Sequence, residues 1–402
     1  ALEHIGSNLG GVILIEHDLN TTDPHLHGFA GYAFETNGRG QSLSAMLKKG
    51  NEKSKFRFTS SAKKGGDKRA PDYFLNNTGF QEINASLLYK RVLNSRWDSE
   101  LFASSYNTEI GILRGAHISN TTDLNLAFGR EVPYFTEDEF SYGIDAPRQL
   151  VNHNLAKLTL NFSDDYKNTL KVSTAVQFNQ RKEYDIRRGN RTSKPTMDLD
   201  KFSFFSEIKH KRIITKNLIL KSGIQNLTAK IKNDFSTGIL PIIPNHISNE
   251  VGLFSILNYQ YKKHDFELGF RSDYAYYDVK YITREVPRIF VDTTQNFINV
   301  SGLFVWNTQV SKKSVFNLSV GAASRAPAIN ELYSYGLHQG VSGFEEGDME
   351  LLPERSLKTS ATFRTESNKF YELEVNGYFQ NVQNFILLVP QLDIVATIRG
   401  IF

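Results

Sequence analysis

Apolar and polar residues alternate with a period of two along most of the chain, the pattern of β-strands whose two faces differ. In one segment Phe266, Leu268 and Phe270 alternate with Glu267, Gly269 and Arg271. The same alternation recurs in 170–178, 316–322 and 371–380. Helical spacing is nearly absent, so the pattern predicts an all-β chain.

Segments of this kind predict fifteen strands. They are expected at 28–36, 41–50, 54–64, 82–92, 97–108, 153–163, 169–183, 200–212, 217–230, 250–262, 265–279, 297–310, 314–325, 356–366 and 369–380. Most are 9 to 15 residues long, whereas strands of soluble sheets centre on about 5–6 residues and tilted membrane-spanning strands need about 9–11. Strand length therefore favours a membrane barrel.

The connections alternate between tight turns and long loops from the third strand onward. The long loops are expected at 65–81, 109–152, 184–199, 231–249, 280–296 and 326–355. In an up-and-down antiparallel sheet every second connection lies at the same end, so one rim carries all the long loops. Outer-membrane barrels have this arrangement, with short periplasmic turns and long extracellular loops. A propeller repeat of about 40–45 residues is not found.

Alternation alone does not say which face meets solvent, so a soluble β-sandwich is the alternative. A sandwich would bury its apolar face between two sheets. Fifteen long strands in one meander argue against it, because open sheets rarely exceed about ten strands without curling. The sequence therefore predicts a transmembrane antiparallel up-and-down β-barrel, with Phe266, Leu268 and Phe270 facing lipid.

Composition narrows the function classes. The chain has 47 Lys and Arg against 43 Asp and Glu, a net charge of +4, so we expect no nucleic-acid partner. No apolar run approaches the roughly 18 residues of a transmembrane helix. The absence of cysteine excludes disulfides and thiolate chemistry, and 29 Phe and 18 Tyr favour β-structure. The chain begins at Ala1 without signal-peptide features, so any export signal is expected outside it.

The run Gly-Ser-Asn-Leu-Gly-Gly-Val-Ile-Leu-Ile at 6–15 looks like the closing strand of the plug domain of TonB-dependent outer-membrane receptors. The segment 324–356 is similar to the Arg-x-Pro, Glu-Leu-Tyr and Leu-x-Pro-Glu-x-Ser series that flanks one extracellular loop in that family. Its matching residues are Arg325, Pro327, Glu331, Leu332, Tyr333, Pro353 and Glu354. Tyr-Gly-x-His at 335–338 and Asn-Thr-Gly-Phe at 77–80 resemble iron-complex receptors of the Bacteroidota.

The resemblance implies a 22-stranded barrel filled by an N-terminal plug. On that basis residues 1–20 are expected to be the C-terminal end of the plug domain. Residues 21–402 are expected to be a barrel incomplete at its C-terminal end, so that the sequence is a fragment of a longer receptor.

The resemblance also implies a function in the bacterial outer membrane: TonB-dependent active uptake of a metal chelate, such as a ferric siderophore or a ferric citrate-like complex. The implied partners are the chelate, the TonB complex, outer-membrane lipid and lipopolysaccharide, with no cofactor. The main alternative is a passive porin-like channel. A barrel enzyme or adhesin is a third hypothesis.

Candidate ligand residues lie in the long loops. Arginines in 184–199 would suit an anionic ferric chelate, or they bind lipopolysaccharide phosphates or only solvent. Loop 109–152 would form a ligand lid or would pack on other loops. The candidates are Arg114, His117, Tyr134, Arg187, Arg188, Arg191 and His338.

Other polar groups are interpreted as structural. Arg325 and Glu354 are expected to pair at two strand ends, where Pro327 and Pro353 stop the ladder. His25-x-His27 lacks the third ligand that zinc or copper would need, so no metal site is predicted. No Gly-x-Ser-x-Gly or His-Glu-x-x-His motif occurs, and we predict no enzyme.

Overall fold

The computed structural model describes residues 2–5, 9, 11–15, 19, 22–113, 115, 121–136, 139–164, 167–187, 191–338, 343–366, 370–391, 396–397 and 400–401. Fifteen strands form one sheet in which each strand pairs antiparallel with the next long strand of the chain, as the sequence predicted. The sheet ends at β1 on one side and at β19 on the other.

The strands of this sheet have the following bounds. They are β1 (His27–Glu35), β2 (Gly40–Gly50), β3 (Ser54–Gly65), β6 (Phe80–Val92), β7 (Trp97–Gly111), β8 (Arg148–Asp164), β9 (Asn168–Tyr184), β10 (Met197–Thr215), β11 (Leu218–Asn233), β12 (Asn245–Tyr261), β13 (His264–Ile282), β14 (Phe290–Ser311), β15 (Ser314–Arg325), β18 (Glu354–Glu366) and β19 (Glu372–Gln383).

Several strands extend further toward the long loops than predicted. β14 begins at Phe290 rather than 297, and the connection expected at 280–296 spans only 283–289. In the added part of β14 the outward positions after Phe290 are Asp292, Thr294 and Asn296, which pair with β13 but are polar. Hydrophobic alternation therefore marks only the lipid-facing part of a strand, and the ladder continues beyond it.

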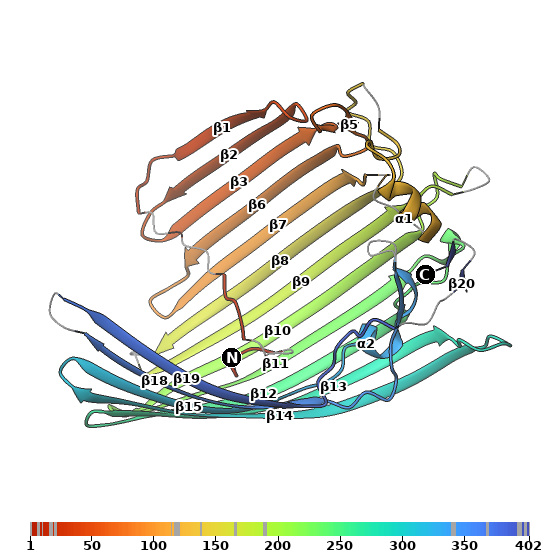
Figure 1. Cartoon of the computed structure of the whole chain (residues 1–402). Helices are drawn as coiled ribbons and strands as arrows, with labels where there is room; N and C mark the ends of the chain where they lie inside the picture. The colour runs from red at the N-terminus through yellow and green to blue at the C-terminus, as the bar shows by residue number, and fades with distance from the viewer. Residues whose placement is uncertain are drawn as a thin grey trace.

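From β2 onward, short turns lie at one end of the sheet and long connections at the other (Figure 1). The long connections contain the small elements β4 (Lys68–Arg69), β5 (Phe74–Leu75), α1 (Thr121–Phe128), the 3-10 helix η2 (Phe235–Thr237), α2 (Ile329–Tyr333), β16 (Tyr335–His338) and β17 (Gly343–Glu346). A hairpin of β20 (Ala396–Thr397) and β21 (Gly400–Ile401) follows β19. The predicted alternation of connections is confirmed.

No helix among the described residues is both long and apolar enough to cross a bilayer.

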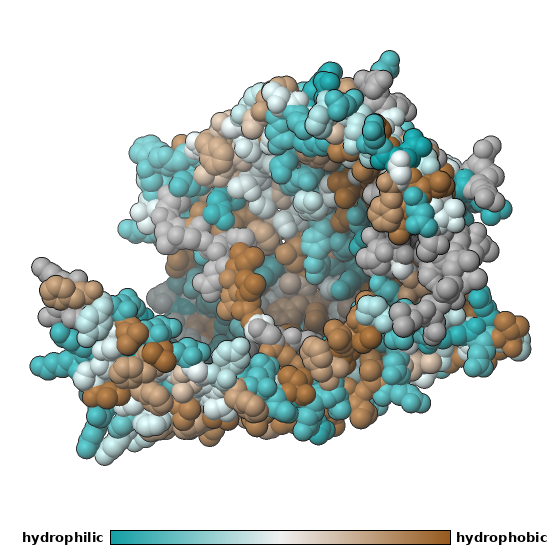
Figure 2. All heavy atoms as spheres, viewed as in Figure 1, coloured by the Kyte–Doolittle hydropathy of each residue, from teal (hydrophilic) through white to brown (hydrophobic). Residues whose placement is uncertain are grey.

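The two faces of the sheet have opposite environments. On β13, Leu268 and Phe270 are 60% and 56% exposed, whereas Arg271 on the other face is 2% exposed. The sheet curves around a hollow on the Arg271 side (Figures 1 and 2). Residues 2–5, near the label N in Figure 1, lie on this side. The apolar face thus points outward, as required in lipid and contrary to a sandwich.

Aromatic residues gather on the outward face near the short turns. Trp97 at the start of β7 packs on Phe162 with ring centroids 5.0 Å apart, and Trp306 near the end of β14 packs on Phe316 at 5.9 Å. Such rings suit a membrane–water interface because one part is apolar and another is polar. We assign this belt to the periplasmic boundary.

We expect Phe270→Lys to destabilise the barrel by about 2–4 kcal/mol, because a lysine on the lipid face near the midplane is poorly solvated. Asn296→Lys, on the same face but above the apolar band, is the control and should cost at most about 1 kcal/mol. Urea unfolding of the full-length protein in lipid vesicles measures both. Equal losses would contradict the assigned lipid face.

Candidate functional site: inner wall and extracellular loops

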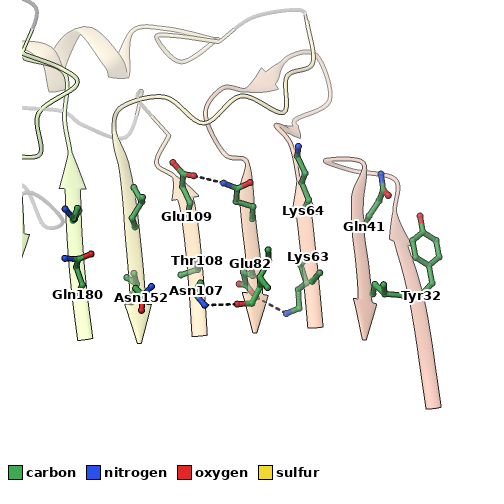
Figure 3. Close-up of a pocket in the computed structure, with 17 residues that line it drawn as sticks. Tyr32, Gln41, Lys63, Lys64, Glu82, Asn107, Thr108, Glu109, Asn152 and Gln180 are labelled. Carbon is green, nitrogen blue, oxygen red and sulfur yellow. Dashed lines mark hydrogen bonds and ion pairs between the residues drawn. The ribbon is translucent and has the colours of Figure 1, made fainter. Parts of the chain in front are cut away.

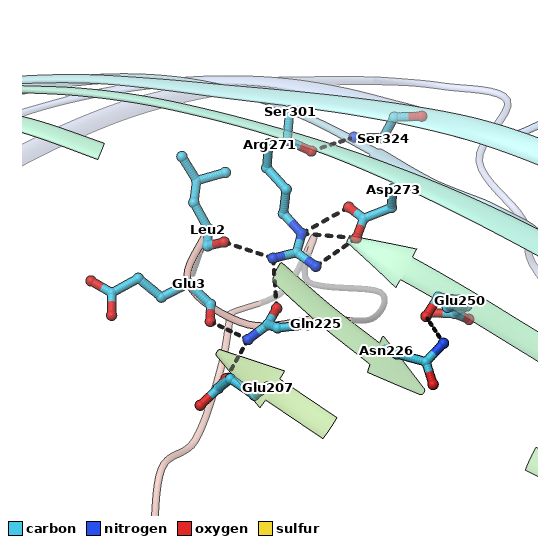
Figure 4. Close-up of polar contacts among 10 residues, drawn as sticks. All are labelled: Leu2, Glu3, Glu207, Gln225, Asn226, Glu250, Arg271, Asp273, Ser301 and Ser324. Carbon is cyan, nitrogen blue, oxygen red and sulfur yellow. Dashed lines mark hydrogen bonds and ion pairs between the residues drawn. The ribbon is translucent and has the colours of Figure 1, made fainter. Parts of the chain in front are cut away.

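The N-terminal segment lies against the inner wall formed by β10 to β13 (Figure 4). Arg271 Nη1 donates to the carbonyl oxygen of Leu2 at 2.9 Å. Gln225 Nε2 donates to the carbonyl oxygen of Glu3 at 2.8 Å, and Lys221 Nζ pairs with the Glu3 carboxylate at 3.0 Å. Two of the three contacts go to backbone carbonyls. These two contacts position the segment independently of which side chains it carries.

Arg271 is the centre of this contact. Its Nε donates to both carboxylate oxygens of Asp273, at 3.0 and 2.8 Å, and its Nη1 also donates to Gln225 Oε1 at 2.9 Å. Arg271 and Gln225 are 2% and 1% exposed. An unpaired donor on such a buried group costs about 1–3 kcal/mol. The carbonyl of Leu2 therefore accepts from a buried donor that would otherwise lack this partner.

Glycines shape the wall so that these groups fit. A Cβ on Gly269 would lie 2.5 Å from Leu2 Cδ1, and one on Gly252 would lie 2.1 Å from Arg271 Nη2. A Cβ on Gly223 would lie 2.6 Å from the ring of Phe254 on β12. The three glycines thus leave room on β11, β12 and β13 for the side chains that pack above them.

Leu2 lies over Gly269 in an apolar part of the wall. It is 9% exposed and packs with Phe254, Ile256 and Leu303. This small cluster holds the segment by apolar burial while Arg271 holds it by hydrogen bonding.

The closing plug strand expected at 6–15 is not present in its described part. Residues 11–15 belong to no strand, and Ile13, Leu14 and Ile15 are 92%, 60% and 84% exposed. A strand needs a ladder partner, and none of the described strands pairs with these residues. Residues 6–8 and 10 lie outside the description.

The family-like motif forms the base of the loop between β15 and β18. Arg325 ends β15 and lies opposite Glu354, the first residue of β18. The expected ion pair between them is present, and Arg325 Nη1 also pairs with Glu331 at 2.8 Å. Glu331 in turn accepts from the backbone N–H of Ala328 at 2.6 Å at the start of α2. One guanidinium thus ties two strand ends to a helix.

The same loop folds over the inner face of β13. Leu332 is fully buried, and Tyr333 packs with Tyr277 and Val279 in one cluster. The hydroxyl of Tyr277 donates to the carbonyl of Pro327 at 3.2 Å. Burial also raises the pKa of Tyr333. These motif residues therefore form a core beneath the loop instead of an open surface.

Arg284, which the sequence did not single out, joins its own loop to 326–353, and that loop contacts a third through Tyr335. Its Nη2 donates to the carbonyl of Gly347 at 2.8 Å, and its guanidinium lies 4.9 Å from the ring centroid of Tyr335. The backbone N–H of Tyr335 donates to Ile242 at 2.9 Å. Loops 234–244, 283–289 and 326–353 therefore pack as one unit; a lone loop arginine carries no sequence signal for this role.

The predicted ligand residues have varied environments. Arg187 is half-buried, and its Nη1 donates to the carbonyl of Thr237 at 2.9 Å, so it links its loop to η2. Arg191 has an exposed side chain. The ring of Tyr134 has the Arg130 guanidinium 3.9 Å from its centroid. Within the described residues no contact joins these groups to one another.

The remaining candidates fall outside the description. These are Arg114, His117 and Arg188. His338 belongs to β16, and its side chain is likewise outside the described part.

A cavity of about 750 Å³ lies on the outward side of the sheet near the long loops, across strands from β1 to β9 (Figure 3). Its lining includes the apolar Ile83. The next outward residue of β6 toward the long loops is the polar Gln81. Gln81 Nε2 donates to Glu109 at 2.6 Å, and Lys182 Nζ pairs with Asp198 at 2.9 Å. The apolar band ends here, which places the extracellular membrane boundary.

His25 and His27 share a carboxylate. Their rings lie 2.7 Å from the two carboxylate oxygens of Asp23. The backbone N–H of His25, together with both rings, holds the pKa of Asp23 below its usual range. No cluster of three or more His, Cys, Asp or Glu able to hold a metal occurs among the described residues.

We expect Gly269→Ala to displace Leu2 from its position over Gly269, because the added Cβ overlaps the leucine side chain. Overpacking of this kind costs about 1–3 kcal/mol, so amide hydrogen exchange at residues 2–5 should accelerate roughly fivefold or more. Gly302→Ala on β14 is the matched control, because its nearest neighbour would be 3.8 Å away. Unchanged exchange in Gly269→Ala would contradict the docking.

Arg325→Met should open the loop base, because it leaves two carboxylates without their cation. Breaking a buried ion pair costs about 3–5 kcal/mol, and hydrogen exchange of the α2 amides reports the local loss. The neighbouring Arg355 is exposed, so Arg355→Met should leave α2 protected. Equal protection in both variants would refute the role given to Arg325.

Comparison with known proteins agrees with this architecture. Residues 17–399 match the family described as TonB dependent receptor-like, beta-barrel. No curated protein matches the sequence significantly. Similar solved structures include the copper transporter OprC, with a TM-score of 0.65 and 14% identity over 92% of this chain and 55% of that chain.

Two further solved structures have the same fold. The hemophore receptor HasR of Serratia marcescens, a double mutant in complex with its hemophore HasA and heme, has a TM-score of 0.65 and 13% identity, covering 91% of this chain and 56% of its own. The ferric yersiniabactin uptake receptor FyuA of Yersinia pestis has a TM-score of 0.60 and 11% identity, covering 90% and 55%.

The chain spans about half the length of these structures. At such low identity their likeness establishes the fold, while the family match covers nearly the whole sequence. An outward apolar face, a polar inner wall and long loops at one rim complete the evidence: the chain belongs to the TonB-dependent receptors, and its strands are part of their bacterial outer-membrane β-barrel.

Proposed function

We propose that this chain is the wall of a receptor that takes up a metal chelate across the outer membrane, with energy supplied through TonB. Hydrocarbon offers no hydrogen-bond partners to an open edge, so β1 and β19 must be paired in the working barrel. Receptors of this family are transporters and not enzymes. The function is therefore binding at the loops followed by gated passage through the lumen.

The observation that carries this proposal is the occupied inner wall. A passive channel needs a clear lumen, whereas here Arg271 and Gln225 hold a backbone segment inside the hollow by hydrogen bonds. A segment fixed in this way suits a gated lumen, because it has to move before a bulky solute passes. This favours a plugged receptor over a porin-like channel.

The chemistry of the cargo is proposed from the loops and from related structures. Those structures carry the titles of a copper transporter, a receptor bound to a hemophore with heme, and a ferric yersiniabactin uptake receptor. A ferric siderophore or a ferric citrate-like complex fits the basic loop that holds Arg187 and Arg191. Tyr134 would supply an aromatic contact from a second loop.

Lipopolysaccharide is proposed as the lipid partner. The outward face turns polar at Gln81, Glu109 and Lys182, where the head groups and sugars of the outer leaflet would lie. Amide and charged side chains suit such polar groups, and the apolar band begins immediately below.

Growth under iron limitation tests the proposed uptake. A strain lacking the gene, supplied with single iron sources, should fail on the cognate chelate and recover with the full-length gene. Purified receptor should conduct little in a planar bilayer. Undiminished growth on every iron chelate would redirect the proposal to another metal complex, and large steady conductance would favour the channel.

Arg191→Glu should weaken binding of an anionic chelate about tenfold at low salt, because the loop then repels the ligand. Lys216→Glu carries the same charge change in the short turn between β10 and β11 and is the control. Affinity measured on purified receptor at two salt concentrations gives the comparison. Equal affinities would remove this loop from the ligand site.

A further inference from the structure

Four lysines face one another on the inner wall, below the docked N-terminal segment. Lys209 on β10 lies directly opposite Lys171 on β9, and Lys211 on β10 lies directly opposite Lys221 on β11. All four are on the same face as the buried Gln225. Like charges directly opposite each other destabilise a sheet, so this arrangement requires compensating anions.

The described residues supply only half of that compensation. Glu207 pairs with Lys209 at 2.9 Å, and Glu3 pairs with Lys221 at 3.0 Å. Within the described part of the chain Lys171 and Lys211 make no ion pair, and both have exposed side chains. Among the described residues the four ammonium groups are therefore paired with only two carboxylates. The wall has an excess of positive charge on the side that faces the hollow.

One of the two carboxylates belongs to the docked segment. Glu3 is held by Lys221 and by the backbone contact to Gln225, whereas Glu207 is part of the wall itself. Burial and then the nearby charge of Lys209 lower the pKa of the adjacent His4, which places the segment close to this lysine. When the segment lifts, Lys221 loses its partner and the positive excess on the wall grows.

We propose that Lys171, Lys209, Lys211 and Lys221 form an anion-binding site on the inner wall, and that Glu3 is its built-in competitor. The ligand class is a small polyanion bearing carboxylates or phosphates, because ammonium groups bind such oxygens as point charges with several donors each. The site goes beyond the proposed uptake at the outer loops: it offers an anionic solute a second contact inside the lumen, available once Glu3 leaves.

The test uses full-length protein in detergent, with tripolyphosphate and citrate titrated separately at low salt. We expect Lys171→Gln/Lys211→Gln to weaken binding at least tenfold and Lys171→Arg/Lys211→Arg to retain it. Glu3→Gln should strengthen binding severalfold, because the competitor is gone. The matched control is Lys55→Gln/Lys358→Gln, which removes two inward lysines from β3 and β18 and should change affinity less than twofold.

Several outcomes would overturn the site. An equal loss in the control pair would mean that overall charge alone attracts the anion. Unchanged affinity in Lys171→Gln/Lys211→Gln, with native migration on unheated gels, would exclude these lysines, and weaker binding in Glu3→Gln would reject the competitor role. Preference between the two probes decides between phosphate and carboxylate ligands. Growth on iron chelates is scored separately, so loss of this site leaves the uptake proposal to its own test.

Discussion

The structure depends on one constraint: in lipid, each backbone N–H and C=O must find its partner within the protein. A continuous antiparallel ladder meets this requirement and leaves side chains to point alternately outward and inward. The outward set can then be apolar, as with Leu268 and Phe270, while the inward set is free to be polar. The alternation along the sequence is a direct consequence of this division.

On the polar inward face a charged side chain can be buried among protein groups that bind it, without contacting hydrocarbon. Arg271 is almost inaccessible, yet each side of its guanidinium meets an acceptor, from Asp273, Gln225 or the carbonyl of Leu2. Glycine at 269 provides the depth that the leucine needs. The wall therefore binds the N-terminal segment through a few well-defined contacts.

The loops are held together by different interactions, because they lie at the end of the hollow and have no face in contact with lipid. Arg325 binds Glu331 and Glu354 at the strand ends, and Arg284 joins neighbouring loops through backbone carbonyls. The motif that resembles the family is thus a folding element of the loop base. Under the proposed function, ligand specificity would fall to exposed side chains such as Arg191.

The sequence by itself determined the strand count, the lipid-facing side and the end that carries the loops, because all three follow from local alternation and turn length. It also predicted the pair of Arg325 and Glu354, since both sit at strand ends that the meander brings together. It missed the full length of β14 because polar outward residues end the alternation before the ladder ends. Only the tertiary structure placed Leu2 on Gly269 and Arg187 on η2, because those contacts join segments whose approach depends on the curvature of the sheet and the packing of the loops, neither of which has a local sequence pattern.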